Sequence, residues 1–259
     1  MTGADDDPFA RFSMQDRVVV VTGASSGLGE QFARVLHAAG ATVVLVARRK
    51  ERLEQLSAAL PRSLVVAANV GVRTECERVV GRAIADFGRI DVLVNNAGTY
   101  ATAPAELEAE EEWRRVMAVN VDGPFWLSQL AGRDMLTRGY GVVVNVASIM
   151  GLVGLGRPPQ TSYRASKGAL INLTRELAAQ WARRGVRVNA LCPGFFKTEM
   201  TNDLLFADPE SVTWLEKRTP MQRGGEVDEL NGAVLFLASE ASSFMTGSVL
   251  VVDGGWTAI

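Results

Sequence analysis

The chain alternates short apolar runs with stretches of helical periodicity, and this alternation limits the folds that are open to it. Buried strands between helices form a parallel sheet with helices on both faces, and such strands are apolar throughout. We therefore expect an α/β fold, a doubly wound parallel sheet of about seven strands. The predicted strands are 17–22, 42–46, 64–68, 92–95, 142–147, 187–191 and 249–252. The predicted helices are 27–39, 49–60, 72–87, 106–120, 122–138, 161–184 and 226–238.

The 259 residues are 47% hydrophobic and 22% charged, which is enough apolar material for one large core. Neither a repeat nor a long linker divides the chain. We expect a single domain over residues 15–259, preceded by a flexible tail over residues 1–14. The acidic start of the sequence lacks the apolar core of a signal peptide, which predicts a cytoplasmic protein.

The composition argues against several classes of function. A formal net charge of −2 gives no general attraction to nucleic acid or to an anionic membrane. No apolar stretch reaches the roughly 18 residues of a spanning helix. Cys76 and Cys192 lie in segments typical of a reduced core. With His37 as the sole histidine, we expect no metal site.

A glycine-rich turn connects the first predicted strand to the first helix, in the text VVVVTGASSGLGE. Glycines in such a turn let the backbone approach a pyrophosphate, which then faces the free N–H groups of the helix N-terminus. A strand–helix connection that binds nothing is the alternative, but the position of the glycines in an alternating fold favours binding. The predicted contacts are Gly23, Ser25, Ser26, Gly27, Leu28 and Gly29.

The spacing TGxxxGxG and a series of later motifs resemble the short-chain dehydrogenase/reductase family, over about residues 15–255. The resemblance implies a Rossmann-type fold and an NAD(P)-dependent oxidoreductase that moves a hydride between nicotinamide and a ketone or secondary alcohol. It also implies a homotetramer or homodimer, with the C-terminal segment around Trp256 and Ile259 at an interface or packed within the chain. The matching residues are Asn95-Asn96-Ala97-Gly98, Asn120, Ser148, Tyr163, Lys167, Cys192-Pro193-Gly194, Thr198 and Asp253-Gly254-Gly255.

The end of the second predicted strand favours NADP. An NAD-binding chain usually has a carboxylate here for the ribose 2′-hydroxyl, but this chain has Ala47 followed by Arg48 and Arg49. A guanidinium binds a 2′-phosphate through two parallel charge-assisted hydrogen bonds and gains much less from a hydroxyl. We expect Arg48 above all to bind the phosphate. For Arg49 a solvated helix start is an equal alternative, and NAD stays open as cofactor.

The remaining cofactor contacts follow from the resemblance. Asn69 occupies the place of an aspartate that accepts a hydrogen bond from adenine, and its amide oxygen can still accept one. Thr198 is expected to bond the nicotinamide carboxamide. The full set is Asn69, Val70, Asn96, Ala97, Gly98, Tyr163, Lys167, Pro193, Gly194, Phe196 and Thr198.

Tyr163 and Lys167 are four residues apart within a predicted helix and therefore leave the same helical face. A free tyrosine has a pKa of about 10, so it is a poor base at neutral pH. A neighbouring ammonium and the positive nicotinamide ring both lower that pKa, which predicts Tyr163 as the proton carrier.

The resemblance completes the catalytic set. It implies that Ser148 holds the substrate oxygen and that Asn120 anchors a water-linked proton path, although a polar helix break is an alternative for Asn120. The segment from Ser148 to Tyr163 is longer than is usual in the family. We expect the extra residues to change the shape of the entrance to the substrate site more than the catalytic chemistry.

The segment after Gly194 carries apolar residues expected to cover the substrate, together with residues of the loop after Ser148. They favour an apolar or aromatic ketone or alcohol, and a 3-oxoacyl thioester is also compatible. Packing of this cover onto the body is the alternative for most of them. The predicted substrate contacts are Ser148, Met150, Val153, Tyr163, Phe195, Met200 and Trp214.

Other functions rank lower. An NAD-preferring alcohol, polyol or hydroxysteroid dehydrogenase would keep the same catalytic set. A non-catalytic dinucleotide-binding module would be expected to lose Tyr163 or Lys167, both present here. An epimerase or dehydratase usually carries an extra C-terminal domain, for which the chain leaves little room.

Overall fold

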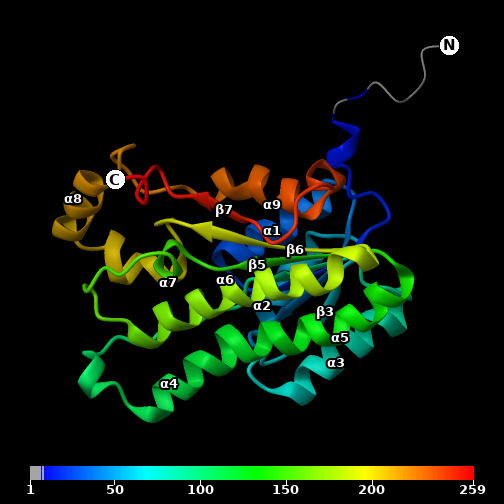
Figure 1. Ribbon diagram of the computed structural model, residues 1–259. Coiled ribbons are helices and arrows are strands. Elements are labelled where there is room, and N and C mark those ends of the chain that lie inside the picture. Colours follow the sequence, from blue (N-terminus) through cyan, green and yellow to red (C-terminus); the bar gives the residue numbers. More distant parts are fainter. Residues whose placement is uncertain (1–6, 8) are drawn as a thin grey trace.

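The computed structural model describes residues 7 and 9–259 and is built on a seven-stranded sheet (Figure 1). The strands lie in the order β3-β2-β1-β4-β5-β6-β7, and every neighbouring pair is parallel. The predicted α/β fold is confirmed. The strands are β1 (Val18–Thr22), β2 (Thr42–Ala47), β3 (Leu64–Ala67), β4 (Val92–Asn95), β5 (Gly141–Val146), β6 (Val186–Pro193) and β7 (Val249–Val252).

Helices cover both faces of the sheet, as Figure 1 shows. One core cluster joins the sheet to α1 (Gly27–Ala38), α2 (Lys50–Ala58) and α9 (Asn231–Ala238). The other joins it to α3 (Arg73–Phe87), α5 (Gly123–Arg138) and α6 (Thr161–Trp181). Because the central strands meet helices on both sides, β1, β4 and β5 are buried along their whole length.

The sheet order reverses between β1 and β4, since β1 pairs with β2 on one side and with β4 on the other. Ligands of open α/β sheets bind outside the carboxyl ends of the strands at such a reversal. The turn after β1 and the loops after β4 and β5 meet at this edge.

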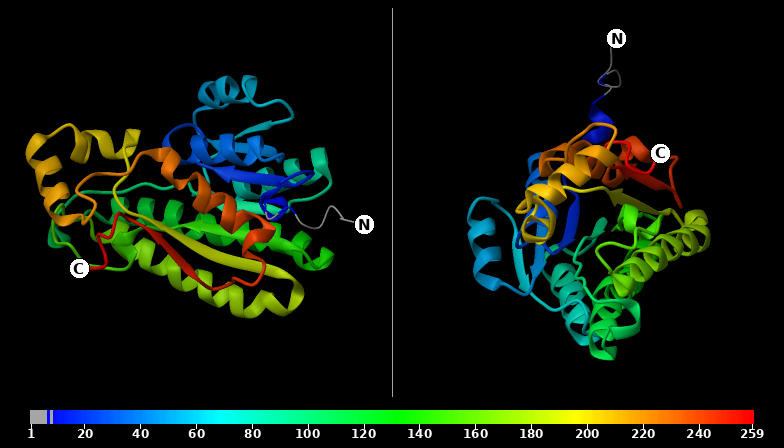
Figure 2. Two further views of the ribbon diagram at one scale, coloured as in Figure 1. Left: turned by 90° about the horizontal axis from the view of Figure 1, so that it is seen from above. Right: turned by 90° about the vertical axis from the view of Figure 1, so that its left-hand side faces the viewer.

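A lid follows β6. It contains α7 (Glu199–Thr201), the π-helical turn η6 (Asn202–Phe206) and α8 (Pro209–Arg218). Figure 2 shows these helices beyond the carboxyl ends of the strands, at the end of the molecule opposite the N-terminal turn η1 (Ala10–Phe12).

Two boundaries differ from expectation. The predicted helices 106–120 and 122–138 form one nearly continuous rod, in which α4 (Glu110–Met117) and α5 are joined by the π-helical turn η3 (Ala118–Asp122). The predicted tail, residues 1–14, lies partly outside the described residues. Within the described part Met14 is 1% exposed in the core and donates its N–H to the Ala39 carbonyl, so the packed body begins before Gln15.

The described residues contain no helix with the length and apolar character needed to cross a membrane. In the same part of the chain, no group of three or more His, Cys, Asp and Glu side chains could hold a metal ion. Cys76 and Cys192 are free and buried, as predicted.

Candidate active site

A cleft of about 610 Å³ lies at the carboxyl edge of the sheet, a size typical of small-molecule and cofactor sites. Its walls come from the turn after β1, the loops after β2 to β6 and the first turns of α6 and the lid. All the residues predicted to contact the cofactor line it. They are Gly23, Ser25, Ser26, Gly27, Leu28, Gly29, Arg48, Arg49, Asn69, Val70, Asn96, Ala97, Gly98, Tyr163, Lys167, Pro193, Gly194, Phe196 and Thr198.

The glycine-rich turn is shaped by close backbone approach. Gly23 has φ +69°, and an added Cβ there would lie 2.8 Å from Asn96 Nδ2. A Cβ on Gly29 would collide with the Gly23 carbonyl oxygen and with Asn96 Nδ2. The Thr22 hydroxyl accepts the N–H groups of Asn96 (2.9 Å) and Ala97 (3.0 Å), which fixes the loop after β4 against the turn. The backbone therefore lies open to the cleft at the N-terminus of α1, the arrangement that suits a dinucleotide pyrophosphate.

Arg49 is bound more firmly in this cleft than its sequence context suggested. Its guanidinium donates to Ser25 Oγ (3.2 Å) and Ser26 Oγ (2.6 Å) of the glycine-rich turn. It also forms a two-bond ion pair with Glu199 of the lid. Arg48 is exposed and lines the same cleft. Both arginines thus lie directly after Ala47, at the end of β2, where an NAD-binding chain usually has a carboxylate.

Asn69 closes an Asx-type turn after β3. Its Oδ1 accepts the Gly71 N–H at 3.1 Å, and its own N–H is donated to Glu75 Oε2 at 2.8 Å. A carbonyl oxygen has two lone pairs, so one hydrogen bond leaves capacity for an adenine amino group.

The three predicted catalytic residues that reach the cleft are Ser148, Tyr163 and Lys167. Ser148 follows β5, and its hydroxyl accepts the Met150 N–H at 3.1 Å. Tyr163 lies in the first turn of α6, and Lys167 Nζ lies 5.6 Å from the centre of its ring. The Lys167 ammonium donates to the Val146 carbonyl at 2.8 Å, which anchors the lysine to the end of β5.

Burial shifts the pKa of both members of this pair in the free chain. Burial of the phenol raises the pKa of Tyr163, and the hydrogen bond with Ser148 only partly opposes this effect. Burial also lowers the pKa of Lys167 to about 8. In the free chain Tyr163 therefore keeps its proton at neutral pH. The lower tyrosine pKa expected from the sequence depends on the positive nicotinamide ring as well as on Lys167, and it stays a prediction for the complex with the oxidised cofactor.

Asn120 lies behind the cleft rather than in its wall. It is fully buried in η3, where its Oδ1 accepts the Thr99 N–H at 2.9 Å. Its Nδ2 donates to the Thr99 carbonyl (2.8 Å) and to Ser166 Oγ (2.9 Å). The side chain thus ties the loop after β4 to the helix of Tyr163, and π-helical turns of this kind are frequent at functional sites.

The predicted substrate contacts divide into two groups. Ser148, Tyr163 and Met200 line the cleft. Met150, Val153, Phe195 and Trp214 lie in an apolar cluster between the lid and the body, to which Tyr163 also belongs, so their contact with the substrate stays a prediction. The rings of Phe195 and Trp214 meet edge to face at 6.2 Å between centroids, since packing the lid buries more apolar surface than an open cleft would.

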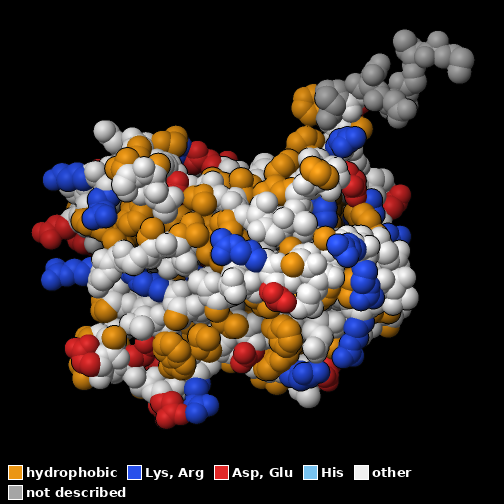
Figure 3. Space-filling model, viewed as in Figure 1, with side chains coloured by type: hydrophobic (Ala, Val, Ile, Leu, Met, Phe, Trp, Pro, Cys, Tyr) orange, Lys and Arg blue, Asp and Glu red, His pale blue; other side chains and the backbone are white. Residues whose placement is uncertain are grey.

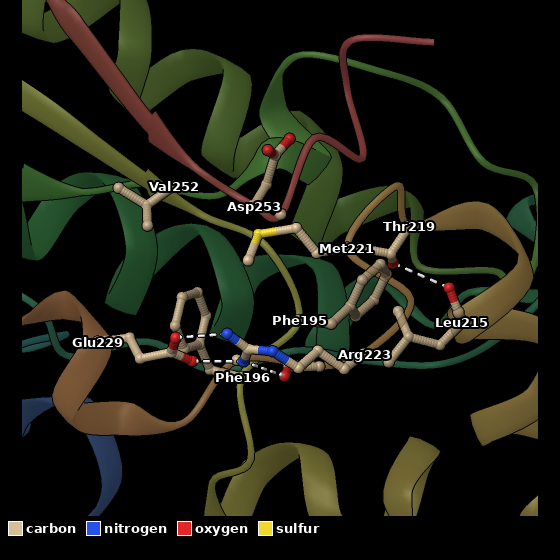
Figure 4. A pocket seen from close by; sticks show the side chains of 12 residues that line it. Phe195, Phe196, Leu215, Thr219, Met221, Arg223, Glu229, Val252 and Asp253 are labelled. Atoms are coloured by element: carbon tan, nitrogen blue, oxygen red, sulfur yellow. Dashed lines mark hydrogen bonds and ion pairs between the residues drawn. The ribbon is translucent and has the colours of Figure 1, made fainter.

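A second cavity of about 80 Å³ lies beside this cluster, at the base of the lid (Figure 4). Phe195 and Phe196 form one side of it, and Phe196 also lines the main cleft. Arg223 crosses the cavity and pairs with Glu229 at 2.6 and 2.7 Å. The pair fixes the return of the chain from the lid to α9.

Several cleft residues were not predicted. Thr99, Tyr100 and Arg115 form one part of the wall, and Glu199 and Thr201 form another. Arg115 donates to Thr99 Oγ1 (2.5 Å) and to the Tyr100 carbonyl (2.9 Å). For Glu199, the sequence offered one indication of a place in the cleft wall: it directly follows Thr198, a predicted cofactor contact.

Comparisons with known proteins agree with this geometry. A family model described as "Enoyl-(Acyl carrier protein) reductase" matches residues 23–257. The chain is 42% identical to a gluconate 5-dehydrogenase of Gluconobacter oxydans, over 95% of this chain and 96% of the relative. It is 43% identical to a galactitol 2-dehydrogenase (L-tagatose-forming) of Cereibacter sphaeroides, over 95% and 97%.

Solved structures give the same result. A gluconate 5-dehydrogenase from Burkholderia cenocepacia, in complex with NADP and tartrate, has a TM-score of 0.91 and 38% identity, with 96% of this chain and 98% of that chain covered. A short-chain type dehydrogenase/reductase from Mycobacterium marinum has a TM-score of 0.91 and 31% identity, with the same coverage. The chain therefore belongs to the short-chain dehydrogenase/reductase family, as an NAD(P)-dependent oxidoreductase that acts on CH–OH and C=O groups.

Proposed function

We propose that the protein interconverts a secondary alcohol and a ketone in a polyhydroxylated substrate, a sugar acid or a polyol, with NADP(H). The observation that carries this proposal is the agreement among the relatives' names. Gluconate 5-dehydrogenase, galactitol 2-dehydrogenase and 5-keto-D-gluconate 5-reductase all act on such substrates, and the last is 40% identical over 94% of this chain.

The lining of the cleft supports the same class of substrate. Phe195 and Trp214, which favoured an aromatic substrate, pack against Trp256 instead. The polar side chains of Thr99, Tyr100 and Arg115 also line the cleft. These side chains offer hydrogen bonds to a substrate with several hydroxyl groups, whereas an apolar ketone has few groups that could use them.

The chain's own residues then divide the chemistry. The nicotinamide, when bound, supplies or accepts the hydride. The Ser148 hydroxyl holds the substrate oxygen, and Tyr163 donates a proton to that oxygen when a ketone is reduced. Negative charge that develops on the oxygen is stabilised by both hydroxyls. Lys167, fixed on the Val146 carbonyl, keeps a positive charge behind the tyrosine.

The preference for NADP rests on Arg48 and Arg49. We expect Arg48→Ala and Arg49→Ala each to raise the Michaelis constant for NADPH much more than that for NADH, since only NADPH carries the 2′-phosphate. Steady-state kinetics with both cofactors measure this. Equal effects on the two cofactors would remove both arginines from the phosphate site.

A substrate panel tests the proposed function. NADPH oxidation is followed with 5-keto-D-gluconate, L-tagatose, an aromatic ketone and an acyl thioester, and NADP⁺ reduction with gluconate and galactitol. Turnover with the sugar-derived compounds and little with the other two is expected. Preference for the aromatic ketone or the thioester would refute the proposed substrate class while leaving the oxidoreductase assignment intact.

A further inference from the structure

A carboxylate of the lid reaches across the cleft to the cofactor side. Glu199 begins α7, and its two oxygens accept hydrogen bonds from the two terminal nitrogens of Arg49, at 2.8 and 2.9 Å. The same guanidinium donates to Ser25 and Ser26 of the glycine-rich turn. One side chain therefore joins the end of β2, the glycine-rich turn and the lid.

The geometry of this ion pair matches that of a phosphate site. A guanidinium binds a carboxylate or a phosphate through the same two parallel N–H groups, so only one of the two anions can occupy them. Glu199 holds the N–H groups that a ribose 2′-phosphate would need. The lid lies close to the glycine-rich turn at this point. A Cβ added to Gly27 would be 3.3 Å from Thr198 Cβ.

The charge on Glu199 is permanent at working pH. Its hydrogen bonds from Arg49 and Ser26 lower the pKa of its carboxyl group to about 2. A dianionic phosphate beside Arg49 therefore meets a full negative charge on the lid as well as a competitor for the guanidinium.

We propose that Glu199 is a specificity-determining residue of the cofactor site, which weakens NADP(H) binding selectively by competing with the 2′-phosphate for Arg49. The inference rests on the proposed use of NADP(H). Glu199 thereby reduces the preference for NADPH over NADH that Arg48 and Arg49 create. The residue responsible lies on the lid after β6 and not in the nucleotide-binding half of the sheet.

The test compares dissociation constants of NADPH and NADH, measured by nucleotide fluorescence on the purified full chain. Glu199→Gln keeps the shape and removes the charge. We expect NADPH to bind about two- to fivefold more tightly, the upper part of the range for one exposed charge contact, while NADH changes by less than about 1.5-fold. Glu210→Gln, an exposed acid at the start of α8, is the matched control and leaves both constants unchanged.

The mechanism predicts a second result. In an Arg49→Ala background the effect of Glu199→Gln on the NADPH constant shrinks to the direct repulsion between carboxylate and phosphate, because the competition for Arg49 is gone. If Glu199→Gln tightens both cofactors equally, or weakens NADPH, the inference is overturned even if the wild type prefers NADPH. If the wild type prefers NADH and neither Arg48→Ala nor Arg49→Ala changes that preference, the proposed cofactor itself fails and the inference fails with it.

Discussion

The protonation states of Tyr163 and Lys167 govern how the rate of reaction in each direction depends on pH. Burial raises the pKa of Tyr163 and lowers that of Lys167 to about 8. Below pH 8 the tyrosine carries its proton and the lysine its charge, which is the state that reduces a ketone. Oxidation of an alcohol needs a tyrosine that has lost its proton, a state that becomes more populated as pH rises.

We therefore expect the turnover number for ketone reduction to be nearly constant below pH 8 and to fall above it, and that for alcohol oxidation to rise with pH. Profiles from pH 6 to 10 in both directions measure this. Lys167→Arg keeps the positive charge over the whole range and should move the falling limb of any residual reduction to higher pH. Reduction that accelerates through pH 8 would mean that another group donates the proton.

At the residue scale, cleft residues that belong to short sequence motifs could be predicted, but contacts between residues far apart in the sequence could not. The glycines and the Tyr163–Lys167 spacing depend on backbone geometry within a few residues, and all of them line the cleft. Arg49 and Glu199 are 150 residues apart, so no sequence period brings them together. Met150 and Trp214 were predicted to contact the substrate from their segments' place in the family and from their hydrophobicity, and hydrophobicity does not distinguish a substrate wall from lid packing.

The first turn of α6 is held by a distant carboxylate. The N-cap position of α6 is Gln160, and its side chain makes no capping hydrogen bond. Instead, the Ser162 N–H is donated to Glu108 Oε2 at 3.2 Å. A carboxylate at a helix N-terminus satisfies an otherwise free donor and interacts favourably with the helix dipole.

Glu108→Ala should destabilise the protein by about 1 kcal/mol, the usual cost of losing an N-cap. Because Tyr163 is the next residue, the turnover number should fall while the NADPH dissociation constant stays unchanged. Thermal unfolding and steady-state kinetics measure the two effects, with the exposed neighbour Glu106 changed to Ala as control. An equal loss of stability in both variants would show that Glu108 has no special role.

At the scale of elements, the strands and long helices follow from local patterns, but their junctions do not. The turn η3 places Asn120 in a fully buried position where the sequence suggested a helix break. Three hydrogen bonds of its side-chain amide, one of them fully buried, offset the irregular backbone. Such compensation comes from Thr99 and Ser166, which lie in other elements.

At the scale of the whole molecule, several apolar side chains are exposed on the surface. The edge strand β7 is only partly covered, with Val251 37% exposed, and Figure 3 shows hydrophobic side chains grouped between charged ones on the face that carries it. Trp113 and Phe125 are also exposed, on α4 and α5. Trp256, in contrast, packs within the chain beside Phe195, whereas Ile259 is 89% exposed.

We propose a homotetramer or homodimer, since an exposed edge strand and apolar side chains favour association. Light scattering behind size exclusion should give two or four times the chain mass of 27.9 kDa. Val251→Glu places a charge on the edge strand and should shift the protein toward smaller species. A monomer at micromolar concentration would contradict the proposal.

The central claim is that the phenol of Tyr163 transfers the proton that accompanies hydride transfer. Removal of that single oxygen in Tyr163→Phe tests it most directly, with turnover measured on the best ketone of the panel and NADPH binding measured by fluorescence. Turnover should fall by about 10²- to 10⁴-fold, the usual share of general acid catalysis, while the dissociation constant changes by less than about twofold. Turnover close to that of the wild type, with NADPH still bound, would contradict the account.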